Sequence, residues 1–306
     1  MKVLITGAAG FVARHMIPFF INAGHEVICV DRNQAPKYLE AEKIRYIRAD
    51  TAEPGDWQNA VAEADAVINL AGKNIFSRWT EKYKQALYDS RIKTTRKVVD
   101  AIDESSPPVL CSTSAVGYYG DQGDTVVDED SPAGDDFLAR LSIDWENTAL
   151  EAEKKGARVV LPRFALVMAK DGGALATMLP SFRFFLGGPQ GSGQHWMPWI
   201  HVKDLVRAME FVIENRGISG PVNFAAPNPV RNADFAKTLA KVLNRPSVFR
   251  VPGFALKAAL GELGGMMLNS QRAVPARLTE AGFRFEYPDI ETALAYELGG
   301  QQQKAG

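Results

Sequence analysis

The chain has 306 residues, of which 46% are hydrophobic and 23% are charged, the usual balance of a globular protein in water. Its 35 Lys and Arg residues are nearly cancelled by 36 Asp and Glu residues, whereas a general nucleic-acid or membrane-surface partner would favour a basic excess. Because no apolar run approaches the roughly 18 residues of a membrane span, we expect a cytoplasmic protein of one large domain, or of one domain with a smaller lobe.

Short apolar strands alternate with helices through the first half of the chain. Strands are expected at residues 2–6, 26–30, 44–47, 66–70, 108–112 and 158–161. Helices are expected at residues 10–23, 82–102 and 135–155, and glycines at 24 and 156 are suited to end the first and the third. This alternation predicts an α/β fold with a Rossmann-type doubly wound parallel sheet.

The pattern changes after about residue 164. Glycines surround an apolar segment at 175–186, and a short strand at 199–202 leads into a helix that ends near 215. Further helices are expected at 232–243, 254–260 and 272–281, and the polar tail 301–306 is expected to fray. We therefore predict a Rossmann domain at 1–165, to which 199–225 returns, and a smaller substrate lobe made of 166–198 and 226–300.

The two cysteines, Cys29 and Cys111, each lie inside an apolar run that is typical of a strand. We interpret both as buried free thiols, with a disulfide or a metal site as the alternatives. The sequence holds no Cys and His cluster at metal-ligand spacing, so no metal site is predicted. The first strand starts at Lys2, which leads us to expect no signal peptide and a reducing compartment.

The first strand is followed by a glycine-rich turn, with the sequence TGAAGFVA at residues 6–13. Gly7 permits a tight turn, and Gly10 lets the backbone approach a pyrophosphate whose charge is attracted to the helix N-terminus. Asp31 closes the second strand about 20 residues later, as the dinucleotide fingerprint requires. A glycine-rich turn without a ligand is the alternative, but the context of strand, turn and helix predicts an NAD(P) site.

Two neighbouring residues leave the choice between NAD and NADP open. The Asp31 carboxylate is suited to ribose hydroxyls and repels a 2′-phosphate, whereas Arg32 can pair with that phosphate. Asp50 is expected either beside the adenine or in a turn, and the cations after the fourth strand either contact the cofactor phosphates or remain in solvent. The predicted cofactor-binding residues are Gly7, Ala9, Gly10, Phe11, Val12, Asp31, Arg32, Asp50, Leu70, Ala71, Gly72, Lys73, Arg78 and Pro162.

Several stretches resemble the extended short-chain dehydrogenase/reductases, the superfamily of nucleotide-sugar epimerases and dehydratases. They are TGAAGFVA at 6–13, NLAG at 69–72, STSAVGYYGD at 112–121 and WIHVKD at 199–204. Within the superfamily the chain is similar to an atypical group labelled epimerase family proteins, through SRIKTT, GYYGD, GGPQGSGQ, PWIHVKD, PVRN and QRAVPARLTEAGFRF. The resemblance covers nearly the whole chain and implies nicotinamide chemistry.

The resemblance also implies a catalytic set, from which this chain departs. The superfamily uses a Ser or Thr, a Tyr that is the acid or base, a Lys four residues later that lowers the pKa of the Tyr, and often an Asn. Ser114 matches the serine, but Leu138 and Ser142 stand at the expected Tyr and Lys positions. Arg91 stands near the expected Asn. The usual Tyr and Lys mechanism is therefore not expected here.

The predicted catalytic residues are Ser114, Tyr118 and Tyr119. Either tyrosine can replace the missing acid, with ring packing as the alternative for both, and Ser114 has a turn or cap role as its alternative. His201 is expected to be structural. Three arginines are candidates to bind an anionic group of the substrate, namely Arg163, Arg231 and Arg272. The alternative for each is an exposed side chain or one that pairs on a helix.

The sequence supports two functions. The first is an NAD(P)-dependent oxidoreductase or epimerase-like enzyme that holds a small molecule between the sheet edge and the lobe. The second is a non-catalytic NAD(P)-binding sensor, which the loss of the Tyr and Lys pair favours. The retained Ser114 and the glycine-rich segment 171–193 favour the enzyme. As in extended members of the superfamily, the helices at 82–102 and 135–155 are expected to form a homodimer.

Overall fold

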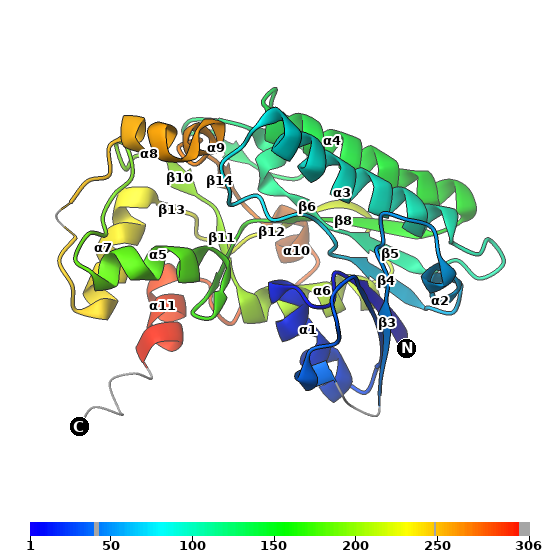
Figure 1. Cartoon of the computed structure of the whole chain (residues 1–306). Helices are drawn as coiled ribbons and strands as arrows, with labels where there is room; N and C mark the ends of the chain where they lie inside the picture. The colour runs from blue at the N-terminus through cyan, green and yellow to red at the C-terminus, as the bar shows by residue number, and fades with distance from the viewer. Residues whose placement is uncertain (40–42, 248, 300–306) are drawn as a thin grey trace.

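A parallel sheet of eight strands forms the centre of the molecule (Figure 1). The computed structural model describes residues 1–39, 43–247 and 249–299. In spatial order the sheet contains β12 (Gly220–Phe224), β8 (Arg158–Phe164), β5 (Val109–Ser112), β4 (Ala66–Asn69), β1 (Lys2–Thr6), β2 (Glu26–Asp31) and β3 (Ile44–Arg48), with β6 (Ser114–Ala115) beside β8. The order reverses next to β1, and open α/β sheets bind ligands at such a reversal, beyond the carboxyl ends of the strands. The predicted Rossmann-type sheet is confirmed.

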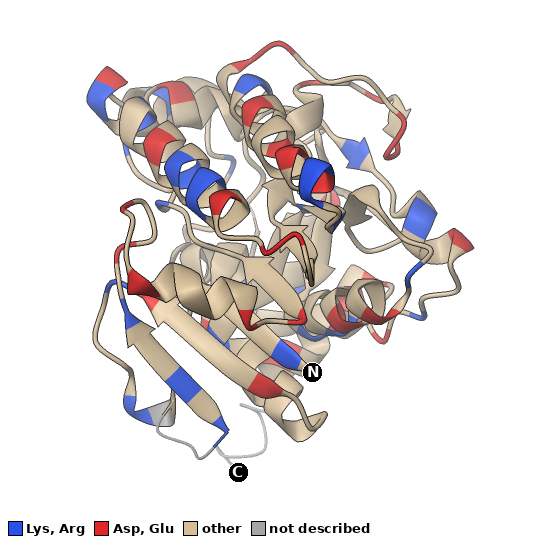
Figure 2. Ribbon diagram, turned by 90° about the vertical axis from the view of Figure 1, so that its right-hand side faces the viewer, with Lys and Arg blue, Asp and Glu red and all other residues tan. Residues whose placement is uncertain are grey.

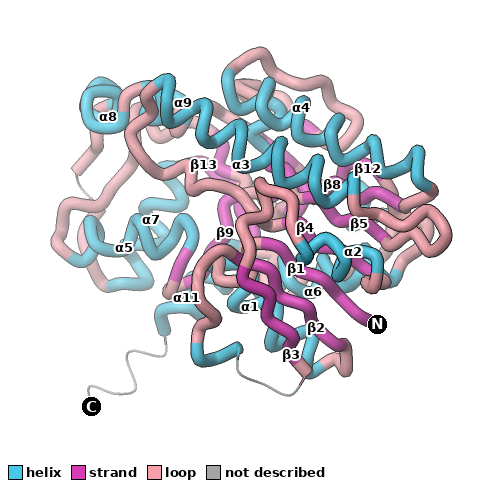
Figure 3. Tube along the Cα trace, turned by 45° about the vertical axis from the view of Figure 1, so that its right-hand side comes forward, coloured by secondary structure: helices cyan, strands magenta, loops and turns pink. Residues whose placement is uncertain are grey.

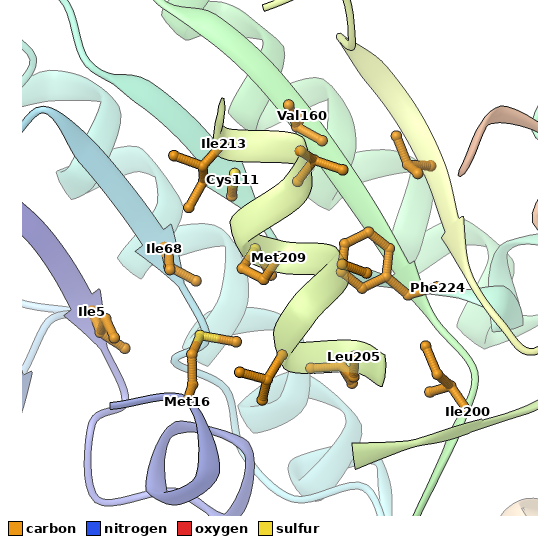
Figure 4. Packing of buried hydrophobic residues seen from close by; sticks show 14 of the residues in the cluster. Ile5, Met16, Ile68, Cys111, Val160, Ile200, Leu205, Met209, Ile213 and Phe224 are labelled. Carbon is orange, nitrogen blue, oxygen red and sulfur yellow. The ribbon is translucent and has the colours of Figure 1, made fainter. Parts of the chain in front are cut away.

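Helices cover both faces of this sheet, as Figures 1 and 3 show. One face carries α1 (Phe11–Asn22) and α6 (Val202–Glu214), and the other carries α3 (Glu81–Asp100) and α4 (Phe137–Leu150). Because successive side chains of a strand point to opposite faces, Ile5 packs toward α1 and α6 whereas Leu4 packs toward α3 and α4. Figure 4 shows the first of these cores, with Met209 of α6 among strand residues such as Ile68. Because helices cover both faces of the sheet, the sequences of its strands are continuous apolar runs.

A smaller lobe lies beyond the carboxyl ends of the strands (Figure 1). Its elements are β9 (Leu166–Ala169), α5 (Gly173–Arg183), β11 (Trp199–His201), α7 (Asn232–Leu243), α8 (Gly253–Leu260), α9 (Glu262–Met266) and α11 (Ile290–Gly299). α5, α7 and α11 share a core of their own, in which Trp199, Phe235 and Leu294 are buried. A ligand bound at the carboxyl edge of the sheet would therefore lie next to this lobe.

Short elements connect these layers. They are η1 (Lys37–Leu39), η2 (Asp56–Gln58), α2 (Asn59–Ala62), η3 (Val116–Tyr119), β7 (Val126–Val127), η4 (Glu151–Lys155), β10 (Trp196–Met197), β13 (Val230–Arg231), β14 (Arg272–Ala273) and α10 (Ala276–Glu280). On the face shown in Figure 2, acidic and basic residues are intermixed. Within 1–39, 43–247 and 249–299, no helix has the length and apolar character needed to cross a membrane.

Some expected elements differ from the structure. The helix expected at 272–281 is instead β14 followed by α10, because Pro275 between them has no backbone N–H and disfavours helix in the residue before it. The helix expected at 135–155 changes into η4 after Leu150, and Gly156 ends that segment with a φ of 81°. Both cysteines are buried free thiols, and burial raises the pKa of each to about 12. The polar tail 301–306 lies outside the described residues.

Candidate functional site

The glycine-rich turn forms a cradle at the carboxyl end of β1. Gly7 has a φ of 68°, and a Cβ built on it would lie 3.0 Å from the backbone of Ala71, so only glycine fits there. The Gly10 amide donates to the Gly7 carbonyl oxygen at 2.9 Å. α1 starts after Gly10 with no side-chain cap and no acidic residue in its first turn. The first-turn amide groups, which have no acceptor within a helix, are therefore available to an anion.

Asp31 fastens this turn to the end of β2. One of its carboxylate oxygens accepts a hydrogen bond from the Ala9 amide at 3.0 Å, and the other accepts two from Asn33, each at 2.9 Å. The side chain is buried. Asp31, which we expected to contact a ribose, thus already orders the phosphate turn through its own hydrogen bonds.

Two arginines stand beside Asp31 at the outer edge of the cradle. Arg32 is exposed, and its side chain has no acidic partner among the residues that the structure describes. The register of β2 and β3 places Arg48 opposite Asp31, and the Arg48 Nε donates to the Arg32 carbonyl oxygen at 3.2 Å. Sequence reasoning missed Arg48, although its place at the end of the third strand was a usable signal. Asp50 accepts from the Ala52 amide at 3.0 Å, which places it in a turn.

Polar side chains lock the neighbouring strand ends together. Thr6 donates through its hydroxyl to Asn69 at 2.7 Å and accepts from the Ala71 amide at 3.3 Å. The backbone of Leu70 and Ala71 thereby stays against Gly7. The structure brings together most of the predicted cofactor residues at this edge, namely Gly7, Ala9, Gly10, Phe11, Val12, Asp31, Arg32, Leu70, Ala71 and Gly72.

The other predicted cofactor contacts lie in different surroundings. The Lys73 ammonium lies over the Tyr83 ring, 4.8 Å from its centre, so it points toward α3. Arg78 is exposed in the loop before α3. Pro162 is buried inside β8, opposite Val222 in the register and two residues before the strand ends. The contacts of Lys73, Arg78 and Pro162 do not place them at the cradle, and their predicted cofactor contacts stay predictions.

The predicted catalytic residues belong to a buried polar network. The Ser114 hydroxyl donates to Glu146 at 2.6 Å, and the Arg163 guanidinium donates to both oxygens of the same carboxylate, each at 2.9 Å. Arg163 also donates to the Tyr119 hydroxyl at 2.9 Å, and that hydroxyl donates to Asn223 at 2.8 Å. The network therefore joins α4, η3, β6, β8 and β12.

This network corrects two expectations. Tyr119 is fully buried with its hydroxyl satisfied on both sides, and burial, which outweighs the contacts with Arg163 and Asn223, raises its pKa to about 12. It cannot reach a substrate, so it is not the replacement acid. Burial alone would lower the pKa of the Arg163 guanidinium, but Glu146 and Tyr119 raise it, and the charge is neutralised internally. Arg163 is thus unavailable to an anionic substrate.

Replacing Glu146 with glutamine should lower the free energy of unfolding by about 3–5 kcal/mol, because a buried guanidinium would lose its counter-charge. Both side chains of the pair are less than a tenth exposed, at 3% for Arg163 and 8% for Glu146. Urea denaturation measures the change. Glu151→Gln is the matched control, since its pair with Lys154 is exposed, and its expected loss is at most about 1 kcal/mol. Equal losses in the two variants would show that the buried pair contributes no special stability.

Tyr118 remains from the predicted catalytic set. It is half-buried, its ring lies 3.5 Å from the Arg163 guanidinium carbon, and its hydroxyl has no partner among the described residues. Leu138, which we predicted at the position of the superfamily tyrosine, packs beside Gly117 of η3.

Arg91 lies between the end of β4 and α4. Its guanidinium lies within 3.5 Å of the point that a Gly72 Cβ would occupy and 5.1 Å from the centre of the Trp145 ring, one turn beyond Ser142 on α4. Its Nη1 donates a hydrogen bond to the Leu87 carbonyl oxygen at 3.2 Å, and no carboxylate among the described residues pairs with it. Burial lowers the pKa of Arg91 to about 10, which keeps it charged at neutral pH. An uncompensated cation therefore lies beside the end of β4.

Residues 171–173 pack against α1 next to the cradle. Arg14 pairs with Asp171 at 3.2 Å, and His15 lies 3.1 Å from the same carboxylate. The Phe11 ring rests against Gly172, where a Cβ would overlap with it. The glycine-rich part of the lobe thus packs on the helix that starts at the phosphate cradle.

The remaining predicted polar residues are held by neighbours. Arg231 and Arg272 both lie over the Trp196 ring, at 4.6 and 4.5 Å from its centre, and Arg231 also pairs with Asp124 at 3.0 Å. His201 is fully buried and lies 3.0 Å from a Glu297 oxygen, in agreement with a structural role. The fold also brings His25, Glu210 and Glu214 together, which no spacing in the sequence indicated.

Comparisons with known proteins agree with this geometry. A family model described as NAD dependent epimerase/dehydratase family matches residues 3–225, and the domain of unknown function DUF1731 matches 251–297. The chain is 44% identical over 300 residues to the epimerase family protein SDR39U1 homolog, chloroplastic, of Arabidopsis thaliana (96% of this chain, 86% of that protein). It is 40% identical over 300 residues to the epimerase family protein YfhF of Bacillus subtilis (96% and 97%).

Solved structures show the same similarity. Human epimerase family protein SDR39U1, isoform 2, crystallised with NADPH, superimposes with a TM-score of 0.85 at 31% identity and covers 98% of this chain and 99% of its own. The nucleoside-diphosphate sugar epimerase of Corynebacterium glutamicum gives a TM-score of 0.79 at 33% identity, with 99% of this chain and 61% of that chain covered. MoeE5 in complex with UDP-glucuronic acid and NAD, at 21% identity and a TM-score of 0.80, shares the fold.

Proposed function

Because the chain belongs to the NAD dependent epimerase/dehydratase family, we propose that it is an NADP-dependent oxidoreductase or epimerase-like enzyme for a small molecule. The observation that carries the proposal is the uncapped N-terminus of α1 behind Gly7 and Gly10, which fits a pyrophosphate. When bound, the cofactor supplies the hydride chemistry. This chain's residues bind and orient it and provide the proton.

The outer edge of the cradle supports NADP over NAD. The oxygens of Asp31 already accept hydrogen bonds from Ala9 and Asn33, so the carboxylate is engaged in holding the turn. Arg32 is exposed beside it, with Arg48 alongside. Guanidinium groups bind a phosphate through charge-assisted hydrogen bonds, and a 2′-phosphate would reach both of them. The human relative was crystallised with NADPH.

Arg32→Ala should weaken NADPH binding by about 10–100-fold and leave NADH binding within about twofold, because only NADPH carries the phosphate that Arg32 would contact. Fluorescence titration with each cofactor measures both constants. Arg45→Ala is the matched control, because Arg45 is an exposed arginine near the start of β3 that is paired with Glu63, and it should change neither constant. If Arg32→Ala weakens the two cofactors equally, the 2′-phosphate is not bound there.

The proton in the proposed reaction comes from Tyr118. Its hydroxyl has no partner among the described residues, whereas those of Ser114 and Tyr119 are engaged with Glu146, Arg163 and Asn223. Arg91 provides positive charge beside the end of β4, where the family's lysine is absent. Ser114 then has a positioning role, since its hydroxyl is directed to Glu146. The reaction is expected to be slow, because no lysine assists the acid.

One observation favours a second function, a non-catalytic NADP sensor. By our sequence alignment with the family's motif, Leu138 and Ser142 stand at the positions of the Tyr and Lys, and neither side chain can perform their chemistry. Parallel titrations with NADPH and NADH, followed by a screen of carbonyl metabolites for cofactor oxidation, separate the two functions. An oxidoreductase predicts NADPH binding with oxidation by at least one carbonyl compound, an epimerase predicts conversion of the substrate with no net oxidation, and the sensor predicts binding with neither.

Assembly through α3 and α4 follows from the same family relationship. The two helices lie side by side on the outer face of the sheet, linked by a hydrogen bond of 3.0 Å from the Tyr88 hydroxyl to Asp144. Sedimentation velocity at micromolar concentration should give the mass of a homodimer. A monomer at that concentration would exclude this interface.

A further inference from the structure

The end of α5 and the start of α8 lie at the end of the lobe away from the sheet (Figure 1), and both carry exposed apolar side chains. Phe184 and Leu186, in the turn that follows α5, are 75% and 62% exposed, and Phe254, in the first turn of α8, is 77% exposed. Phe185 and Phe249 are about half exposed. Contact of apolar surface with water is unfavourable, and contiguous exposed apolar patches mark interaction sites.

Backbone contacts join the two segments that carry these side chains. The Val251 amide donates to the Pro189 carbonyl oxygen at 2.9 Å. A Cβ built on Gly188 would overlap with the backbone of Phe249. The turn after α5 and the link that leads into α8 therefore belong to one surface.

The charges that these two segments carry are all positive. Residues 180–189 and 244–260 contain no acidic residue and four basic ones, namely Arg183, Arg245, Arg250 and Lys257. All four are exposed, and none pairs with a carboxylate among the described residues. The Arg245 guanidinium lies 4.9 Å from the centre of the Phe185 ring, so cations and aromatic rings are interleaved. The basic excess that the whole chain lacks, with 35 cations against 36 anions, is therefore present locally.

We propose that this surface, which we call the basic aromatic end, docks the protein on an anionic lipid membrane. Lipid headgroups supply the negative charge that the four cations lack, and apolar side chains beside the cations can enter the boundary between headgroups and acyl chains. Phe184, Phe185 and Leu186 are consecutive in one turn and all exposed. A fluid bilayer can receive all three side chains, whereas a rigid protein partner would need a separate pocket for each.

A second copy of this chain fits the basic aromatic end less well than lipid does. A symmetric contact would place this end of one copy on the same end of the other. Such a contact would bring cations such as Arg183 and Arg250 against like charges, which opposes association. Docking on lipid is also independent of the proposed reaction, because none of these residues belongs to the cradle or to the buried polar network.

Flotation of the protein with vesicles tests the proposal. We expect partition onto phosphatidylcholine vesicles that contain about 30% phosphatidylglycerol to be at least about 10-fold stronger than onto phosphatidylcholine alone, because each cation near an anionic surface contributes about fivefold. The double variant Phe184→Ser with Phe254→Ser should weaken partition onto the anionic vesicles by at least about 10-fold, since it removes the inserted apolar groups. Arg183→Gln with Arg250→Gln should weaken it by about 10–25-fold and leave partition onto phosphatidylcholine unchanged.

Val126→Ser and Arg216→Gln are the matched controls for the two double variants. Val126 is 48% exposed in β7, and Arg216 is exposed in the loop after α6, so both lie outside the basic aromatic end. Each control should keep partition within about twofold of that of the unmodified protein. The substituted side chains are all exposed, and circular dichroism with thermal unfolding shows that each variant folds.

Absence of partition onto the anionic vesicles would overturn the proposal, as would partition that the double phenylalanine variant leaves unchanged. Self-association of the protein without vesicles, lost in Phe184→Ser with Phe254→Ser, would show that a second copy covers this surface. Binding to polyglutamate as tight as binding to the anionic vesicles would assign the surface to an acidic protein partner instead.

Discussion

Replacing Gly10 with valine is expected to weaken NADPH binding by at least about 100-fold, because the bound phosphates would lose two or more charge-assisted hydrogen bonds to the α1 amides. A Cβ at this position would stand 2.9 Å from the Gly7 carbonyl oxygen, inside the turn that the cofactor must approach. Gly10 has a φ of −74°, which valine can adopt, so the sheet should still form. NADPH fluorescence titration measures the loss.

Gly55→Val is the matched control for this substitution. Gly55 also has an extended backbone, but a Cβ there would make an ordinary contact with Trp57 at 3.4 Å, far from the cradle in sequence. Circular dichroism and thermal unfolding without cofactor show whether each variant folds. Unchanged NADPH affinity in folded Gly10→Val would remove the glycine turn as the pyrophosphate site.

Tyr118→Phe is expected to lower turnover by about 10²–10⁴-fold, the range for loss of a general acid. The substitution removes one oxygen and leaves the ring against Arg163. The measurement is the rate of NADPH oxidation on a carbonyl substrate found in the screen, with the Kd of NADPH recorded for the same protein. A rate loss at unchanged NADPH affinity identifies a chemical role.

Tyr119→Phe and Ser114→Ala separate chemistry from structure. Tyr119→Phe removes a buried hydroxyl that accepts from Arg163 and donates to Asn223, so it should cost about 1–3 kcal/mol of stability and little activity. Ser114→Ala should act in the same way, because that hydroxyl donates to Glu146. If Tyr118→Phe keeps full activity while Tyr119→Phe loses it, the assignment of the acid is wrong.

The sheet and the cradle could be predicted because their signals are local. Apolar runs such as 2–6, the turn that contains Gly7 and Gly10, and Asp31 at a fixed distance all lie within one strand–helix–strand unit. β12 was harder, because Gly220 and Pro221 interrupt its apolar pattern, and it forms through pairing with the distant β8. Pro275 similarly divides a segment that looks helical by composition.

The catalytic region could be predicted only in part, because long-range pairing decides which polar groups are free. Nothing in the sequence shows that Arg163 is neutralised by Glu146, or that Tyr119 and not Tyr118 is buried, since the two tyrosines are adjacent. Burial and hydrogen-bond partners are properties of the assembled structure.

The most direct test of the account is transfer of deuterium to a carbonyl substrate from NADPH that carries deuterium at both C4 positions of the nicotinamide, followed by mass spectrometry of the product. The enzyme proposed here predicts a product that carries one deuterium, at a rate that falls with Gly10→Val and with Tyr118→Phe. Saturable NADPH binding to the unmodified protein, with no deuterium in the product of any carbonyl compound in the screen, would contradict hydride transfer to a substrate and favour the sensor.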